Sequence, residues 1–139
     1  MTLTMEGLVE NYLLNRGSGN TVWKYPLLGA VAHALYGRVA EATKRMECYF
    51  CGRKFNKKNG LILHMLRAHG GELKYIVYDV IETYRRLRTR VREVWRGGRY
   101  YVRLDLNSIS LRFSSVGELA TYVMAHPEVF RELDGGSSG

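Results

Sequence analysis

Apolar residues recur at helical spacing along the first part of the chain. Two leucines and a tyrosine mark a short helix within Thr4–Asn15, and the glycine- and serine-rich run that follows should end it. Pro26 can begin a second helix, because its missing N–H is not needed in a first turn. The alanine-rich sequence from Pro26 to about Arg45 carries a wide apolar stripe, which predicts a second helix.

The strongest helical pattern lies in the middle of the chain. Apolar residues recur at intervals of three and four from Leu73 onward, and arginines occupy the opposite face. This periodicity predicts one long helix from about Glu72 to Arg96, which Gly97-Gly98 should end. Tyr84 and Trp95 fall on its apolar stripe, so we expect both rings in the core.

After this helix the pattern alternates with the period of a β-strand. The segments RYYVRLDL and ISLRF are separated by Asn107-Ser108, which favours a hairpin. Ser115 and Glu118 have the spacing of a helix capping box, so a final helix is predicted over Val116–Ala125. Pro127 can begin one further turn or two.

These elements predict an α+β fold that is mostly helical. Residues 1–71 should form a helical region that ends in a strand–strand–helix unit, with strand-like pieces in Met46–Phe55 and a helix over Lys57–His69. Residues 72–134 should hold the long arginine-rich helix, the hairpin and the C-terminal helix. Gly70-Gly71 is a helix stop and a candidate hinge between the two parts, and residues 135–139 (GGSSG) resemble a flexible tail.

Composition narrows the class of protein. The 46% of apolar residues suffices for a core, and no apolar run approaches the roughly 20 residues of a membrane span. The first residues carry an acid where a signal peptide has positive charge, so we expect an intracellular protein (cytoplasm or nucleoid) with no membrane partner. The lack of glutamine and the abundance of arginine are typical of proteins from hot environments.

Charge points to a polyanionic partner. The net charge is +8, and nine of the 15 arginines lie between Arg85 and Arg112. Guanidinium groups match phosphate geometry, and interleaved aromatic rings can stack on bases. The alternatives are a solvated basic face or a surface for an acidic protein. The residues that we expect to contact nucleic acid here are Arg85, Arg86, Arg88, Arg92, Arg96, Arg99, Tyr101 and Arg103.

A metal-ligand pattern lies between the second helix and the long helix. Its spacing is Cys48-x2-Cys51-x12-His64-x4-His69. Two cysteines on a tight turn can direct both sulfurs at one ion, and the two histidines can reach it from neighbouring turns of a helix. A closed set of thiolate and imidazole ligands selects Zn²⁺. Because four ligands leave no open coordination position, we expect no catalytic activity.

This segment resembles the classical C2H2 zinc-finger family over residues 46–69. Phe55 matches the family's aromatic residue four positions after the second cysteine, and Leu61 matches the leucine three positions before the first histidine. The resemblance implies a zinc-bound ββα finger and suggests that its helix binds DNA in the major groove. The chain is also similar to small zinc-finger proteins of archaea and archaeal viruses.

The finger helix is poorly suited to reading bases. The positions that would do so are Lys57, Gly60 and Leu63, and neither glycine nor leucine offers a side-chain hydrogen bond. A helix that is apolar on nearly every side is normally buried. We therefore expect a largely structural finger embedded in a larger fold, with Lys54, Lys57 and Lys58 available to phosphates.

Together these features predict a zinc-containing nucleic-acid-binding protein. We expect double-stranded DNA as its partner, in a regulatory role such as transcription regulation or in an architectural role. The alternative is a zinc-stabilised adaptor whose basic face binds an acidic protein. A homodimer is plausible, because the two apolar helices expose more surface than so small a chain easily buries.

Overall fold

The computed structural model describes residues 4–16 and 25–135 of the chain, and its fold is α+β and mostly helical, as predicted. Three short antiparallel strands form one sheet, in the order β1-β2-β3. The helices are α1 (Met5–Leu13), α2 (Pro26–Lys44), α3 (Lys58–Ala68), α4 (Gly70–Thr89), α5 (Val116–Ala125) and α6 (Val129–Gly135), and the strands are β1 (Val91–Arg96), β2 (Arg99–Asp105) and β3 (Ser110–Phe113).

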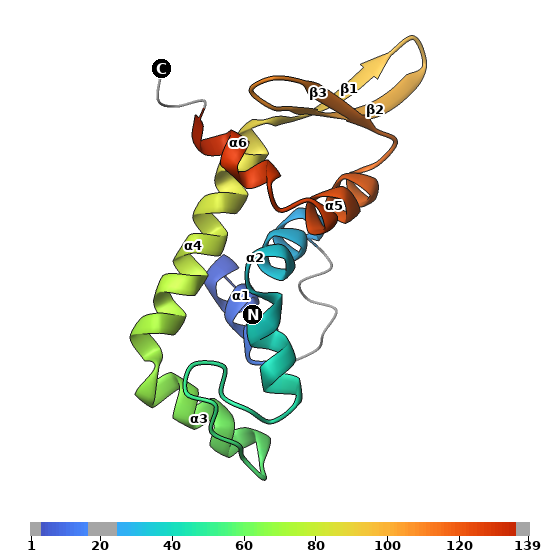
Figure 1. Cartoon of the computed structure of the whole chain (residues 1–139). Helices are drawn as coiled ribbons and strands as arrows, with labels where there is room; N and C mark the ends of the chain where they lie inside the picture. Colours follow the sequence, from blue (N-terminus) through green and yellow to red (C-terminus); the bar gives the residue numbers. More distant parts are fainter. Residues whose placement is uncertain (1–3, 17–24, 136–139) are drawn as a thin grey trace.

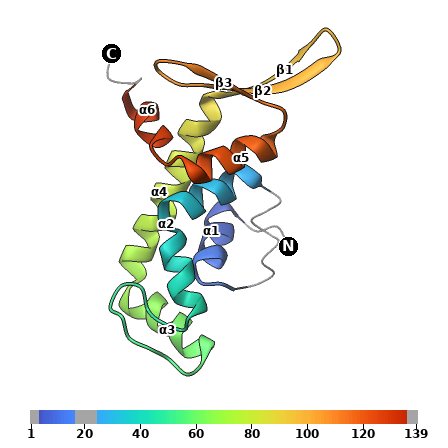
Figure 2. The same ribbon diagram turned by 45° about the vertical axis from the view of Figure 1, so that its right-hand side comes forward.

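Helix α4 runs along most of the molecule (Figure 1). The α3 segment and the cysteine loop lie at the end where α4 begins, and the sheet lies at the end where α4 stops. Helices α1, α2 and α5 lie between these ends, with α2 packed on α1, α4 and α5. A second view shows the same separation of α3 from the sheet (Figure 2). The metal-ligand segment and the sheet therefore belong to opposite ends of the protein.

One hydrophobic core connects the elements. It extends from Leu8 in α1 to Leu133 in α6 and includes residues of both predicted regions. Burial of such side chains is the main favourable contribution to folding. None of the described helices combines the length and the apolar character that crossing a membrane would require.

Helix α4 is shorter than its periodicity predicted. It ends at Thr89, and Val91–Arg96 forms strand β1 instead of the last turns of a helix. The spacing of Val91, Val94 and Trp95 fits a helix, but valine and tryptophan also favour strands, and pairing with β2 satisfies the backbone here. Trp95 is consequently 77% exposed, so the prediction that it lies in the core is wrong, whereas Tyr84 does pack against the core.

Gly70 and Gly71 begin α4. Helix α3 ends at Ala68, and His69 lies between the two helices as the C-cap of α3 and the N-cap of α4. Helix α3 therefore stops just before the glycine pair, close to the predicted stop, but both glycines lie in the first turn of α4 and only His69 lies between the two helices.

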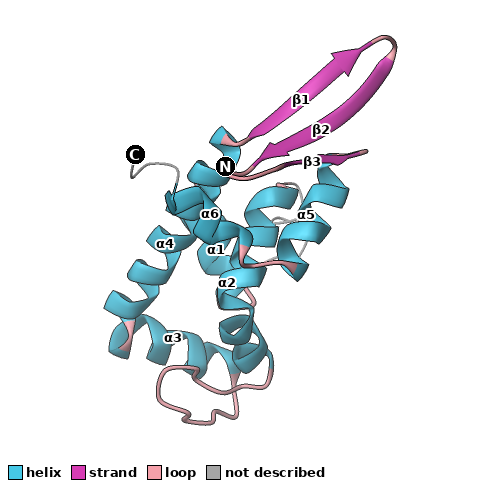
Figure 3. Ribbon diagram, turned by 45° about the horizontal axis from the view of Figure 1, so that its top comes forward, coloured by secondary structure: helices cyan, strands magenta, loops and turns pink. Residues whose placement is uncertain are grey.

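The predicted hairpin is present, and β1 adds a third strand to it. Strand β2 pairs with β3 through residues Val102 to Asp105, and with β1 through residues Arg99 to Leu104. Gly97 and Gly98 join β1 to β2 with φ angles of 58° and 77°, which is the backbone of a two-residue type I′ turn. Because β3 stops opposite Val102, the outer part of the β1–β2 hairpin extends beyond it (Figure 3).

The C-terminal helices follow the capping signals in the sequence. The Ser115 hydroxyl accepts a hydrogen bond from the Glu118 N–H at 3.1 Å, and the Glu118 carboxylate accepts one from the Ser114 N–H at 2.8 Å. Helix α5 begins and ends where it was predicted. A short further helix, α6, follows Pro127. Of the predicted tail, residues 136–139 lie outside the described residues.

Candidate metal centre and basic sheet face

A tight loop between α2 and α3 holds the two cysteines. The Cys48 N–H donates to the Arg53 carbonyl at 2.8 Å, and the Gly52 N–H donates to the Cys48 carbonyl at 2.7 Å. Gly52 has a φ of 78°, a conformation that disfavours other residues and lets the chain reverse directly after Cys51. The two predicted strand pieces reduce to a single bridge between Glu47 and Lys54. Of the predicted ββα arrangement, the structure therefore shows a loop with one β-bridge and a helix.

All four predicted ligands converge. His64 lies on α3, and His69 follows the last residue of that helix. One ligand atom from each of Cys48, Cys51, His64 and His69 lies within 4.8 Å of the other three. The Cys51 Sγ and the His64 Nε2 are 3.3 Å apart. These four side chains are close enough to hold one metal ion.

The two nitrogens of His69 have different surroundings. Its Nδ1 lies 3.0 Å from the Glu72 carboxylate. Its Nε2 is buried and has no hydrogen bond of good geometry among the described residues, although His69 interacts with Cys51. A buried polar atom normally has a partner, so this nitrogen is suited to bind a cation. The hydrogen bond to Glu72 would keep the proton on Nδ1 and the lone pair on Nε2, which is the usual arrangement of a metal-binding histidine.

The two thiols differ in pKa. Hydrogen bonds from the Arg53 backbone, then from His64 and His69, lower the pKa of Cys51 to about 6, so Cys51 is a thiolate at neutral pH. Burial raises the pKa of Cys48. Cys48 would therefore need a nearby cation to ionise readily, whereas Cys51 is already a good ligand. A hydrogen bond to Glu72, and next one to Cys51, raise the pKa of His69.

Aromatic rings enclose the two histidines. Phe55 lies over His64 with ring centroids 5.0 Å apart, and Phe50 stacks on His69 at 5.0 Å with planes 28° apart. Leu61 of α3 is fully buried. Phe55 and Leu61 occupy the positions that the sequence indicated. Phe50 was missed, although an aromatic residue between two closely spaced cysteines is a usable signal.

Helix α3 buries one face and exposes the other. Leu61, Ile62 and Met65 are buried, and α3 packs against α4. Leu63 is 49% exposed. The other positions that were considered for contact with nucleic acid are exposed as well: Lys54, Lys57, Lys58 and Gly60. The finger helix is therefore embedded on one side only.

A second cluster of predicted residues lies on the sheet. Directly paired residues of antiparallel strands point to the same face. The register pairs Arg92 with Arg103, Arg96 with Arg99, Val94 with Tyr101, and Arg103 with Arg112. We call this surface the arginine face, and it consists of Arg92, Val94, Arg96, Arg99, Tyr101, Arg103, Asp105, Ser110 and Arg112. The opposite face of the sheet carries Val102, Leu104 and Phe113 and packs on α5.

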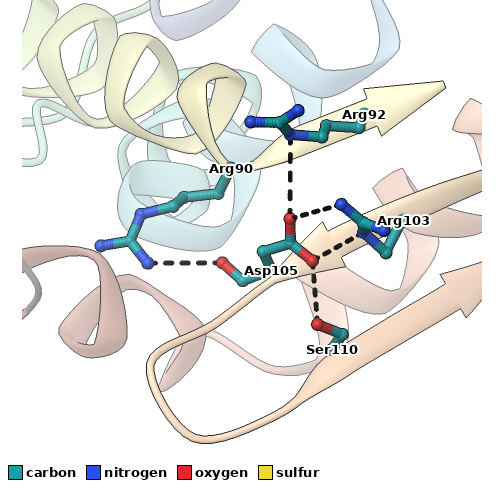
Figure 4. Close-up of polar contacts among 5 residues, drawn as sticks. All are labelled: Arg90, Arg92, Arg103, Asp105 and Ser110. Atoms are coloured by element: carbon teal, nitrogen blue, oxygen red, sulfur yellow. Dashed lines mark hydrogen bonds and ion pairs between the residues drawn. The ribbon is translucent and has the colours of Figure 1, made fainter.

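Asp105 is the one acid on the arginine face (Figure 4). Arg103 contacts its carboxylate at 2.8 Å, Arg92 lies 4.0 Å from it, and the Ser110 hydroxyl donates to it at 2.9 Å. Partial burial acts to raise the pKa of Asp105, but Ser110 and the two arginines hold it below its usual value. Five arginines against one carboxylate leave this face with a net charge of +4 (5 − 1).

No family model matches this chain, and neither a curated protein nor a solved structure is significantly similar to it. Its function is therefore inferred from the chemistry of these two sites.

The other predicted nucleic-acid contacts are distributed over two more surfaces. On α4, Arg85 pairs with Glu82 at 3.2 Å, and Arg88 donates to the Tyr84 hydroxyl at 3.3 Å. Arg86 is also exposed on this helix. Lys54, Lys57 and Lys58 lie by α3, at the far end of the molecule from the sheet (Figure 1). Arg112 was not predicted, because only the strand register brings it beside Arg103.

Proposed function

We propose that Cys48, Cys51, His64 and His69 bind one Zn²⁺ as a structural ion, and that the arginine face binds nucleic acid, with double-stranded DNA as the partner. The observation that supports nucleic-acid binding most strongly is the set of three directly opposed arginine pairs with a single carboxylate among them. Like charges placed directly opposite one another destabilise a sheet. Phosphate groups bound between them would remove that repulsion.

A structural role for zinc follows from the ligand set. Four sulfur and nitrogen ligands complete a tetrahedral shell and leave no position for a substrate. Cys48, Leu61 and Met65 belong to the hydrophobic core, so an ion bound here would fasten the cysteine loop to α3 and to the rest of the fold. Zinc binding and ordering of this loop would then be one process.

Two features of the arginine face suit a DNA backbone. The outer part of the β1–β2 hairpin, which carries Arg96 and Arg99, projects beyond β3, where a duplex could reach it (Figure 3). Among the described residues, Arg96 and Arg99 have no ion-pair partner, so their guanidinium groups are available for phosphates. Each phosphate neutralised releases counterions, which makes the affinity depend on salt.

Metal binding is tested by exchanging single histidines. His64→Asn should lose the ion, because asparagine is a poor zinc ligand and three ligands remain. His126→Asn is the control, because it makes the same substitution at an imidazole that contacts Glu128 at 2.9 Å and lies outside the cluster. Metal analysis of the purified proteins should find about one zinc per chain in wild type and His126→Asn, and well under one in His64→Asn. Wild-type protein that stays zinc-free and folded would refute the metal site.

DNA binding is tested by titrating random duplex DNA at several salt concentrations. The wild type should bind with an affinity that falls steeply with salt. In Arg96→Gln/Arg99→Gln the slope of log affinity against log salt should decrease by about 1.8, because two phosphate contacts are lost at about 0.9 each. Lys57→Gln/Lys58→Gln makes the same change in net charge at the other end of the molecule and should alter the slope much less. Absence of binding by the wild type at low salt would exclude this function.

A further inference from the structure

The tip of the β1–β2 hairpin carries an exposed aromatic pair. Trp95 pairs across the strands with Tyr100, and their ring centroids are 4.5 Å apart. By register, both rings lie on the side of the sheet opposite the arginine face. Strand β3 reaches only as far as Val102, so it does not pair with this part of the hairpin. Trp95 is 77% exposed, the largest exposed fraction of any bulky apolar side chain in the described residues.

Stabilisation of the hairpin explains only part of this arrangement. Cross-strand aromatic pairs next to a turn do stabilise a two-stranded ribbon. The Tyr100 hydroxyl also donates to Glu93 at 2.7 Å, which holds the tyrosine ring in place. However, most of the Trp95 surface remains in water after the pair has formed. Burial of an indole is among the larger apolar contributions available to binding, so this ring is suited to a partner.

The neighbouring residues indicate what kind of partner fits. Arg96 and Arg99 flank the turn directly after Trp95 and directly before Tyr100, and they point to the other side of the ribbon. The tip thus presents cations on one side and an aromatic surface on the other. Nucleic acid offers both complements, because it has phosphates and flat bases. Inside an intact duplex the neighbouring base pairs cover both faces of each base, so only an unpaired base could stack on Trp95.

We propose that Trp95 stacks on an unpaired base of the nucleic acid that the arginine face binds. This proposal rests on the proposed function, since the arginines would supply the accompanying phosphate contacts. The unpaired base can belong to a bulge in a duplex or to a single strand. In either case the protein would prefer nucleic acid with an accessible base over a fully paired duplex.

The test uses the zinc-loaded full chain and three DNAs at one salt concentration. These are a paired duplex, the same duplex with one extra unpaired thymine, and one of its single strands. In the Trp23→Phe variant, Trp95 is the sole tryptophan, so its fluorescence reports on the hairpin alone. We expect the fluorescence to be quenched by at least one of the two DNAs with an accessible base, and that DNA to bind about tenfold more tightly than the paired duplex. Comparing the bulged duplex with the single strand identifies the source of the base.

Substitution of the indole gives an independent measurement. Trp95→Ala should weaken binding of the preferred DNA about tenfold to one-hundredfold, as expected for loss of a base–aromatic stack, and should change duplex binding little. Tyr75→Ala, which removes a 66% exposed ring from α4, should leave both affinities unchanged. Equal affinities for all three DNAs with unchanged Trp95 fluorescence would overturn stacking but leave the proposed function standing. Failure of the wild type to bind any of them would overturn both.

Discussion

At the scale of single residues, His69 links the candidate metal centre to helix α4. Its imidazole lies in one cluster with the two cysteines, and its Nδ1 contacts Glu72, which lies in the first turn of α4. An acid also suits the positive end of a helix. Glu72 therefore orients the ring of a candidate ligand and takes part in no other described hydrogen bond or ion pair. It would serve as the outer-shell partner that metal-binding histidines usually have.

Replacement of Glu72 by glutamine tests this role. Glutamine retains the size of the side chain but accepts a weaker hydrogen bond, so His69 should be less well oriented and a weaker ligand. We expect the zinc affinity, measured by competition with a chelator of known affinity, to fall about tenfold to one-hundredfold. Glu82→Gln makes the same change of charge further along α4, beside Arg85, and should leave zinc affinity unaltered. Equal affinities in the two variants would show that Glu72 does not support the metal site.

The ligands and their partners differ in how far the sequence predicts them. Cys48, Cys51, His64 and His69 lie within 22 residues, and short-range spacing on a turn and a helix is enough to bring them together. Glu72 contacts His69 because α4 begins directly after that histidine. Phe50 contacts His69 because the cysteine loop folds back toward the end of α3. The contact with Glu72 depends on three-dimensional placement, so the ligand spacing did not indicate it, whereas the position of Phe50 between the two cysteines was a local signal.

At the scale of elements, the boundary between α4 and β1 decides where the charges lie. Valine and tryptophan at positions 91, 94 and 95 fit the period of a helix, and the following glycine pair was interpreted as a helix stop. Gly97 and Gly98 instead form the turn of a hairpin. Backbone pairing with β2 then favours a strand over a helix for residues 91–96. Local periodicity does not show which other strand a segment will pair with. As a consequence, Arg92 and Arg96 share a flat surface with arginines of β2 and β3.

The glycine turn gives a prediction at this scale. Both glycines have positive φ angles, a conformation that is unfavourable for alanine by about 1–2 kcal/mol per residue. Gly97→Ala/Gly98→Ala should therefore destabilise the hairpin tip by roughly 2–4 kcal/mol. Nuclear Overhauser contacts between Trp95 and Tyr100 should weaken or vanish. Gly97→Asn is the control, because asparagine adopts positive φ readily and Asn-Gly is a favoured turn of this type. Unchanged contacts in the double alanine variant would mean that the ribbon does not depend on this turn.

At the scale of the whole molecule, α4 separates two sites with different chemistry. Its first turn contacts the candidate metal centre through Glu72, and its last turn leads through Arg90 into β1. Arg90 donates to the Asp105 carbonyl at 3.4 Å and to the Asn107 side chain at 3.3 Å, which fixes the sheet to the end of the helix. The metal loop and the arginine face have no such connection and lie at opposite ends (Figure 2). A structural ion at one end should therefore have little influence on charge contacts at the other.

Removal of zinc tests this separation. A strong chelator should disorder the cysteine loop, because four converging ligands would lose the ion that holds them, and hydrogen exchange should increase over residues 46–69. Backbone amides of β1, β2 and β3 should keep their protection, since the sheet packs on α5 and its hydrogen bonds involve no residue of the loop. The affinity for duplex DNA at constant ionic strength should then change by less than about threefold. A tenfold change would correspond to about 1.4 kcal/mol of binding free energy, so the expected effect is smaller than that. Chelation that abolished DNA binding while the sheet stayed protected would instead place the finger, with Lys54, Lys57 and Lys58, within the binding surface.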